Sequence, residues 1–200
     1  MLASISPLGE RARSSRWGAT VTAYVLGSVL GGATVGLLAA ALGSLLPSSW
    51  RSSPAAGVLV AVLLLAGLLL DLRAAGLRLP TWRRQVDEAW LGRYRGWVYG
   101  GGFGVQLGLG VVTIVTSATV YATVLLCVLS GSPPVGLAVG TLFGLLRALP
   151  VLGLARIHDR AALHRLFHRV ERWAPRADRL ARATLATGAA ALVAAAVGRS

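Results

Sequence analysis

The sequence lacks several residues on which soluble enzymes and nucleotide-binding proteins depend. It has one cysteine, Cys127, and no lysine, so all twenty basic residues are arginine. A single cysteine excludes an intramolecular disulfide framework, and the absence of lysine excludes the phosphate-binding loop that ends in Gly-Lys-Ser/Thr. Charged residues make up only 14% of the chain, whereas soluble domains carry about 25%. The composition therefore argues against a soluble domain.

Apolar residues are abundant instead, and they fall in long runs. They make up 55% of the chain, and the mean hydropathy is +0.68. A helix needs about 20 apolar residues to cross a bilayer, with some latitude for tilt and for flanking arginines that reach the interface. The sequence predicts an all-α, polytopic membrane helix bundle, formed as one integral membrane domain over residues 1–200, with five transmembrane helices at about 19–46, 55–70, 97–129, 135–154 and 183–197.

The arginines between these segments indicate an orientation. Three lie in the tail 1–16, six in the connection 71–96 and eight in the connection 156–182, whereas the other side has only Arg51 and Arg199. Because cytoplasmic loops carry the excess of arginine, we expect a protein of the inner (cytoplasmic) membrane, with its N-terminus in the cytoplasm and its C-terminus outside. The excess of arginine on the cytoplasmic side also accounts for the net charge of +13, so no nucleic-acid partner is predicted.

The cytoplasmic connections carry apolar residues at helical spacing among their arginines. The connection 156–182 predicts an amphipathic helix in the membrane interface that ends near Pro175, and 71–96 has a similar pattern. The partners expected there are the bilayer and its anionic lipid headgroups. A solvated connecting helix without a lipid role is the alternative.

Glycines recur every four residues in three of the predicted spans, and those of the first are Gly27 with Gly31 and Gly32 with Gly36. A dinucleotide site would require an acidic residue shortly downstream of its glycines, and none follows the glycines of "GGGFGVQLGLGVVTIVTS" (100–117). Small residues at this spacing let membrane helices approach closely. The turn "SGSPPVG" (130–136) predicts an antiparallel hairpin in which the two glycine rows face one another. The predicted packing residues are Gly100, Gly104, Gly108, Gly136, Gly140 and Gly144.

Polar residues concentrate in the third span, which is also unusually long. Its 33 residues would form about 50 Å of straight helix, so it must tilt, extend into the interface or break. Its polar side chains either line a pathway or bond within their own helix and to neighbours. The candidate pathway-lining residues are Gln106, Thr113, Thr116, Ser117 and Tyr121, joined by Arg147 from the fourth span.

Arg147 is the one ionisable residue well inside a span. It is either an anion partner or gate, or an arginine whose side chain snorkels toward the cytoplasm.

His164, His168 and Glu171 share a helix face and are weak candidates for metal ligands. We predict no metal and no other cofactor. No catalytic set lies within the spans, so we expect no enzyme.

Residues 97–155 resemble part of the second repeat of the cytochrome c biogenesis CcdA/DsbD transmembrane family. "FGVQLGLGVVTIVTS" stands in place of the family's cysteine-bearing helix, "SGSPPVG" is similar to its turn, and "LFGLLRALP" to a later element. The resemblance implies a transmembrane conduit, but the family's relay uses two cysteines, one per repeat. This sequence has no proline–cysteine pair near residues 114–116.

The sequence thus predicts a diverged relative of that family, a small transporter or conduit without its thiol relay. The alternative is a non-transporting scaffold or accessory subunit that binds a membrane or periplasmic partner protein, anionic lipid or a second copy of itself. A third hypothesis is electron transfer through intermolecular pairing at Cys127.

Overall fold

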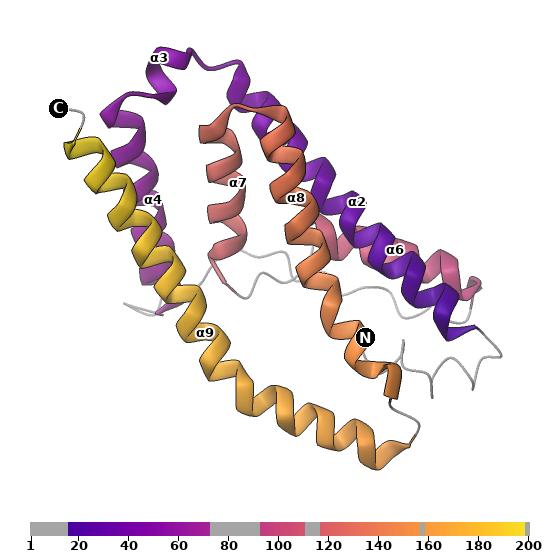
Figure 1. Cartoon of the computed structure of the whole chain (residues 1–200). Coiled ribbons are helices and arrows are strands. Elements are labelled where there is room, and N and C mark those ends of the chain that lie inside the picture. The colour runs from indigo at the N-terminus through magenta and orange to yellow at the C-terminus, as the bar shows by residue number, and fades with distance from the viewer. Residues whose placement is uncertain (1–15, 73–92, 111–116, 157–158, 199–200) are drawn as a thin grey trace. The chain divides into compact units, whose positions relative to one another are not determined.

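The computed structural model describes residues 16–72, 93–110, 117–156 and 159–198, and all regular elements among them are helical (Figure 1). A shorter apolar helix is α7 (Thr119–Ser130). The helical elements and the stretches long enough to span a membrane confirm the predicted fold class, an all-α polytopic membrane protein. Within the described residues four helical stretches are long and apolar enough to cross a membrane: α2 (Trp17–Ser44), α4 (Pro54–Asp71), Pro133–Ala155, and His164–Val197 within α9 (Arg160–Val197).

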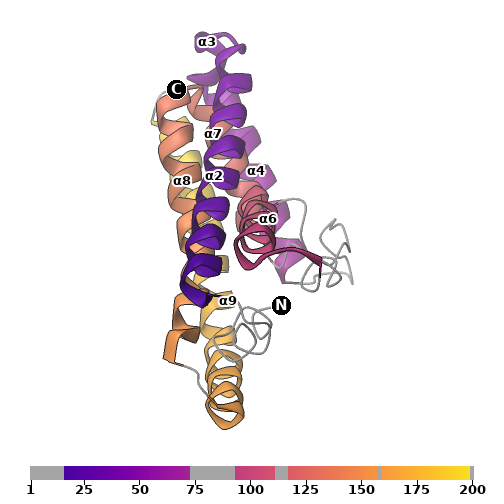
Figure 2. The same cartoon turned by 90° about the vertical axis from the view of Figure 1, so that its right-hand side faces the viewer.

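The helices α2 and α4 form where the first two apolar segments were predicted. Figure 2 shows the short helix α3 (Ser48–Arg51) in the connection between them. Ser53 precedes α4, and its hydroxyl accepts a hydrogen bond from the backbone N–H of Ala56 at 3.2 Å. Pro54 follows at the first helical position, where the missing N–H costs nothing. This cap and proline fix the start of α4.

The third apolar segment was predicted as one helix over 97–129, and this is wrong. The structure has α6 (Gly96–Leu109) and then α7, which begins at Thr119. Gly110 ends α6 with a φ of 70°, a conformation that glycine adopts without steric cost and that a right-handed helix cannot continue through. Breaking was one of the three alternatives that the length of this segment allowed.

The fourth segment forms α8 (Pro133–Ala148), and a 3₁₀-helix extends it over Leu149–Arg156. The change of helix type falls where Pro150 removes a backbone donor. The predicted turn before α8 is present: Gly131 ends α7 with a φ of 53°, in the left-handed region. The two helices are thereby joined by two residues, Gly131 and Ser132.

The last helix overturns a further prediction. The sequence predicted an interfacial helix that ends near Pro175 and a separate span over 183–197, but α9 continues through Pro175 as one helix. Proline removes only one helical hydrogen bond, and the carbonyl that loses it belongs to Glu171, which is exposed and open to water. The amphipathic pattern predicted for 71–96 falls mostly on residues outside the described ranges.

The chain folds into two compact units, and each has its own core. The first unit comprises Met1–Thr34, Arg83–Ile114 and Gly140–Ala174, with Tyr24, Tyr99, Phe103, Val151 and Leu154 among its buried residues. The second comprises Val35–Trp82, Val115–Val139 and Pro175–Ser200, and its buried residues include Val60, Leu64, Ala118, Leu185 and Ala189. The single membrane domain over 1–200 stays a prediction.

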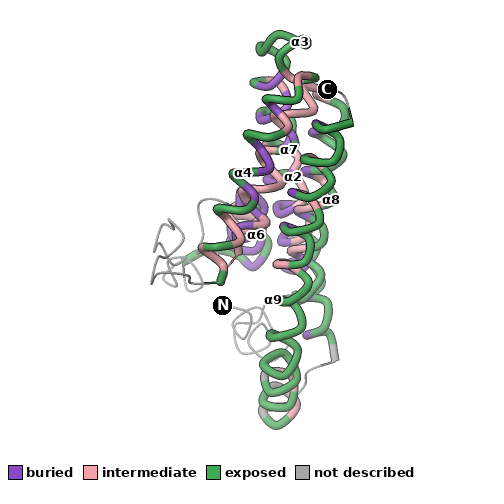
Figure 3. Tube along the Cα trace, turned by 90° about the vertical axis from the view of Figure 1, so that its left-hand side faces the viewer, coloured by how far each residue is buried: buried purple, intermediate pink, exposed green. Residues whose placement is uncertain are grey.

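Outside these cores, many residues along the helices are exposed, as the green stretches of Figure 3 show, and large apolar residues are among them. Leu30 and Leu42 of α2 have exposed fractions of 63% and 64%, and Leu69 of α4 has 56%. Soluble proteins rarely expose so much contiguous apolar surface. Because lipid is as apolar as leucine, these faces suit a bilayer.

Candidate functional site

The glycines of α6 form a row that rests on the backbone of α2. A Cβ added at Gly100, Gly104 or Gly108 would collide with the carbonyl oxygen of Thr20, Tyr24 or Ser28, respectively. The residue numbers of the contacting partners increase together along both helices, so α2 and α6 run parallel. Glycine at these positions lets the two backbones touch, which is the closest approach that helices in a membrane can make.

The glycines of α8 also face α2, and here the helices are antiparallel. Cβ atoms at Gly136 and Gly144 would collide with the carbonyl oxygens of Gly36 and Ser28, and one at Gly32 would meet the carbonyl oxygen of Gly140. The expectation that the two glycine rows face one another is therefore wrong. Spacing identifies the face of a helix, but it does not identify the neighbour that this face meets.

Ser28 of α2 lies where these contacts converge in the first unit. It is fully buried, with an exposed fraction of 0%, and its hydroxyl donates a hydrogen bond to the backbone carbonyl of Gly144 at 2.7 Å. The backbone of Ser28 meets Gly104 and Gly108 of α6 as well. A hydrogen bond across a glycine contact fixes the register of α2 against α8.

Among the described residues, a polar cluster lies in the second unit, at the start of α7. The carboxylate of Asp71, the last residue of α4, accepts a hydrogen bond from the Ser117 hydroxyl at 2.7 Å and from the backbone N–H of Ala118 at 2.9 Å. The guanidinium of Arg182 in α9 donates to the backbone carbonyl of Asp71 at 3.3 Å. We call Asp71, Ser117, Ala118 and Arg182 the Asp71 cluster.

The Asp71 cluster joins two helix ends that need partners. The first N–H groups of a helix have no acceptor within it and carry partial positive charge, so a carboxylate is favourable there. The last carbonyls of α4 have the opposite need, which Arg182 meets. Ser117 was predicted to line a pathway, whereas Asp71 was not predicted as a site residue, because its only signal in the sequence is an acidic residue at the end of an apolar run.

The predicted pathway residues do not share one helix. Gln106 is half-buried on α6 in the first unit, whereas Ser117 and Tyr121 are half-buried near the start of α7 in the second. Thr113 and Thr116 lie outside the described residues. The proposed lining of a single polar face therefore has no continuous helix beneath it, and among the described pathway candidates only Ser117 belongs to the Asp71 cluster.

Arg147 lies in the first unit, on the last turn of α8, and is half-buried. Its guanidinium carbon lies 5.3 Å from the ring centroid of Phe143, one turn earlier, in a cation–π contact. It also interacts electrostatically with the phenol of Tyr24 on α2. The ring of Phe143 thus lies against the guanidinium of Arg147.

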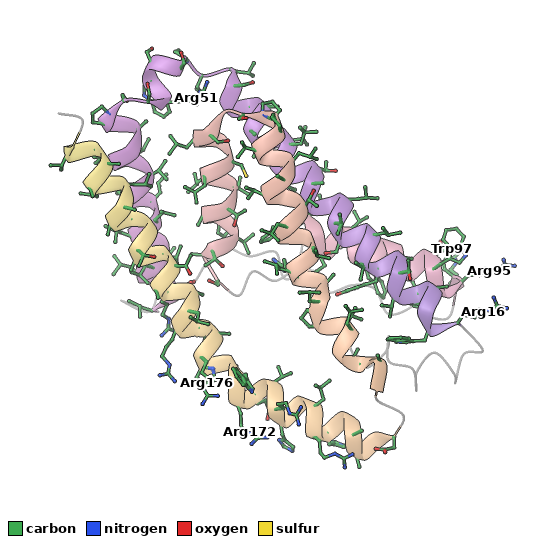
Figure 4. All side chains as sticks on the ribbon, viewed as in Figure 1. Arg16, Arg51, Arg95, Trp97, Arg172 and Arg176 are labelled. Atoms are coloured by element: carbon green, nitrogen blue, oxygen red, sulfur yellow. The ribbon has the colours of Figure 1, made fainter. Side chains whose placement is uncertain are left out.

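The weak metal candidates lie on the exposed, arginine-rich part of α9. His168 Nδ1 and Glu171 Oε2 are 3.3 Å apart, with exposed side-chain fractions of 74% and 73%. Among the described residues, no three His, Cys, Asp or Glu side chains come together as a metal site would require. Figure 4 shows nearby Arg172 and Arg176 extending from this part of the helix.

Two further predicted features have structural partners in the second unit. Cys127 is buried, with an exposed fraction of 2%, among Ala39 and Ala40 of α2. Arg51 of α3, labelled in Figure 4, donates to the carbonyl of Ser130 at the end of α7 at 2.9 Å and to that of Leu46 at 3.3 Å. Arg51 thus ties a helix end to the connection between α2 and α4.

Comparisons with known proteins place this architecture in a family. The model of a family described as the cytochrome c biogenesis protein transmembrane region matches residues 2–186. A curated relative, the methylamine utilization protein MauF of Paracoccus versutus, is 32% identical over 148 residues, which are 74% of this chain and 54% of that protein. The chain therefore spans about half the length of this relative. No solved structure matches. With most of its length matched and its helices apolar enough to span a bilayer, this chain belongs to the cytochrome c biogenesis protein transmembrane region family.

Proposed function

We propose that this membrane protein is a conduit-type component of a system that matures redox proteins outside the cytoplasm, and that it works without a thiol relay of its own. It would reside in the inner membrane with its arginine-rich connections in the cytoplasm, in accordance with the positive-inside rule. It would assist this process by passing a substrate, and it would not itself be an enzyme.

The observation that carries the proposal is the interrupted third apolar segment. The helix α6 ends at Leu109, and Gly110 follows it with a positive φ. The next helix, α7, begins at Thr119 and has the Asp71 carboxylate at its N-terminus. Membrane helices are broken where the irregular backbone lines a cavity or meets protein, because lipid offers no hydrogen bonds. In transporters, substrate and ion sites gather at such half-helix ends. This arrangement favours a conduit over a bundle that serves only as an anchor.

The chemistry of Cys127 supports a mechanism without a relay. Passing electrons through a chain by thiol exchange requires two cysteines that alternate between dithiol and disulfide. Cys127 is alone in the sequence and buried. A thiol that solvent and partners cannot reach is a poor nucleophile for exchange, which also disfavours intermolecular pairing.

The relative with the name methylamine utilization protein suggests the biological setting. We extend to this chain a role in producing a functional redox protein outside the cytoplasm, either a c-type cytochrome or a protein of methylamine utilization. The family description supports the former and the name of the relative supports the latter.

A gene deletion in the organism that encodes the chain tests this proposal. The readouts are the content of haem-stained c-type cytochromes and growth on methylamine, with wild-type and variant genes restored at equal membrane abundance. We expect Cys127→Ser to restore function fully and Asp71→Asn and Ser117→Ala to restore it poorly. Thr184→Ala is the matched control, because Thr184 is exposed and its hydroxyl bonds to the carbonyl of Leu180 in the same helix.

Three outcomes would contradict the proposal. A deletion without effect on either readout removes the maturation role. Loss of function in Cys127→Ser establishes a thiol mechanism. Full function in both Asp71→Asn and Ser117→Ala shows that the start of α7 does not contribute to a conduit.

A scaffold or accessory subunit is the second candidate, and the exposed arginines of α9 favour it. Arg165, Arg169, Arg172 and Arg179 are all exposed, and each basic residue near an anionic membrane surface contributes about 1 kcal/mol to attraction. Replacing these four arginines by glutamine separates the two functions. If that variant loses function while Asp71→Asn retains it, the accessory role replaces the conduit.

A further inference from the structure

Within the residues that the structure describes, the guanidinium of Arg147 makes no hydrogen bond, although it lies within a helix that is apolar enough to span the membrane. A guanidinium carries five N–H donors. In the described part of the chain, the polar interactions of Arg147 are the cation–π contact with Phe143 and the electrostatic interaction with Tyr24. Neither group offers the oxygen pair that arginine prefers.

Tyr24 brings a second donor to the same place. Its side chain has an exposed fraction of 4%, within the core of the first unit beside Tyr99 and Phe103. Buried tyrosine hydroxyls usually have a hydrogen-bond partner. The described residues provide none for Tyr24, whereas the phenol interacts with the Arg147 guanidinium. Ser28 and Gly144 are hydrogen-bonded across the antiparallel helices α2 and α8, so Tyr24 and Arg147, each about one turn farther along, bring donors to the same place. In the described part of the chain neither of these two side chains is hydrogen-bonded.

The helices around this place supply no counter-charge. No acidic residue occurs in α2, α6, α8 or the 3₁₀-helix that follows α8. The two described acidic residues of the first unit are engaged elsewhere: Asp159 accepts from the backbone N–H of Ala162, and Glu171 contacts His168. Charged residues inside membrane proteins are normally paired or mark a ligand pathway.

We infer that Arg147 and Tyr24 form a binding site for an oxyanion, a phosphate or carboxylate group that accepts from the guanidinium and from the phenol hydroxyl. Arginine presents a planar fork that matches such groups in a bidentate way. The contact with the Phe143 ring uses none of the N–H donors of the guanidinium in a hydrogen bond to oxygen. The group belongs either to a small soluble anion or to the headgroup of an anionic lipid. The inference rests on the proposed function in one respect: a soluble anion bound at Arg147 and Tyr24 would be the substrate that the conduit carries.

Thermal unfolding of the purified full-length protein in lipid nanodiscs tests the site. In one arm, inorganic phosphate replaces chloride at constant ionic strength in nanodiscs of phosphatidylcholine alone. In the other, no phosphate is present and part of the phosphatidylcholine is replaced by phosphatidylglycerol. We expect one of these probes to raise the melting temperature of the wild type by about 2–4 °C. A response to phosphate identifies a soluble anion, and a response to phosphatidylglycerol identifies a lipid headgroup.

The variants show whether this response depends on the site. Arg147→Gln should abolish it, and Arg147→Lys should weaken it because ammonium is a point charge without the fork. Tyr24→Phe keeps the buried ring and should weaken the response by loss of the hydroxyl, which provides a test even where Arg147→Gln does not fold. Thr184→Ala is the control, since Thr184 is uncharged, exposed on α9 and bonded to Leu180 of the same helix, and it should respond as the wild type does.

Two results would overturn the inference: no response of the wild type to either probe, or an equal response in wild type, Arg147→Gln and Tyr24→Phe. The proposed function fails on a different result, namely full maturation by Asp71→Asn and Ser117→Ala. Because Arg147 and the Asp71 cluster belong to different units, the two failures can be told apart.

Discussion

The hydroxyl of Ser117 donates a hydrogen bond of 2.7 Å to the carboxylate of Asp71, a residue 46 positions earlier in the chain. This contact joins the end of α4 to the start of α7. It makes the beginning of a membrane half-helix depend on a side chain from another helix, so a change at either residue should alter both.

Asp71→Ala should lower the free energy of unfolding by about 1–3 kcal/mol, because the Ser117 hydroxyl and the N–H of Ala118 lose their shared acceptor. Thermal unfolding in one detergent measures the loss, with Asp178→Ala as control since Asp178 is exposed on α9. The double variant with Ser117→Ala should show a coupling of about 0.5 kcal/mol or more. Strict additivity of the two single changes would contradict the contact.

Gly104→Ala should destabilise the protein by about 1–3 kcal/mol, because the new methyl group would collide with the backbone of α2 at Tyr24 and force the helices apart. Gly18→Ala is the matched control within α2, since nothing lies within 4 Å of a Cβ there. Alanine is a better helix former than glycine, so the control should be neutral or slightly stabilising. Equal melting temperatures for the two variants would argue against close contact between α2 and α6.

Ser28→Ala should lower the stability by about 0.6 kcal/mol, the mean for hydrogen bonds between membrane helices, and by no more than about 1.7 kcal/mol. It removes the bond to Gly144 and leaves that carbonyl without this donor. Thr34→Ala in the same helix serves for comparison, because the Thr34 hydroxyl bonds to Leu30 one turn earlier and is exposed. A larger loss in Thr34→Ala than in Ser28→Ala would be the opposite of what the structure implies.

Accessibility of introduced cysteines should reveal the orientation in the membrane. In a Cys127→Ser background, a cysteine at position 49 in α3 should react in intact cells with a maleimide that cannot cross the inner membrane. A cysteine at position 172 in α9 should react only after that membrane is permeabilised. Both positions are exposed, so access alone decides the outcome. The reverse pattern would place the arginines outside and contradict the positive-inside argument.

Composition and hydropathy were enough to predict the membrane class and the positions of α2, α4 and α8, because burial in lipid demands long apolar runs wherever a chain crosses. They did not predict the end of α6 at Gly110 or the continuity of α9 through Pro175. A glycine in an apolar run is compatible with a helix and with a break, and only its φ distinguishes them. A proline on an exposed helix face loses a hydrogen bond that water can replace.

The candidate site was predicted only in fragments, for a similar reason. Ser117 and Arg147 stood out as polar residues in apolar surroundings, but Asp71 and Tyr24, their partners, come from other helices. Sequence spacing describes neighbours on the same helix, and it contains no information about which helix lies opposite. The partner of each glycine row was missed on the same grounds.

The helix α2 packs against both α6 and α8, and this limits where the chain can tolerate insertions and deletions. Gly31 and Gly32, adjacent in sequence, receive α6 and α8, respectively, and Ser28 touches both helices one turn earlier. An extra residue after Ser28 would rotate the following residues by about 100° around the helix axis. It would thereby bring Leu30 to the place of Gly31 against α6 and Val35 to the place of Gly36 against α8. The connections between helices can vary in length without such an effect. We therefore expect functional length variants to arise in the loops, and a single-residue insertion within α2 to abolish assembly of the first unit.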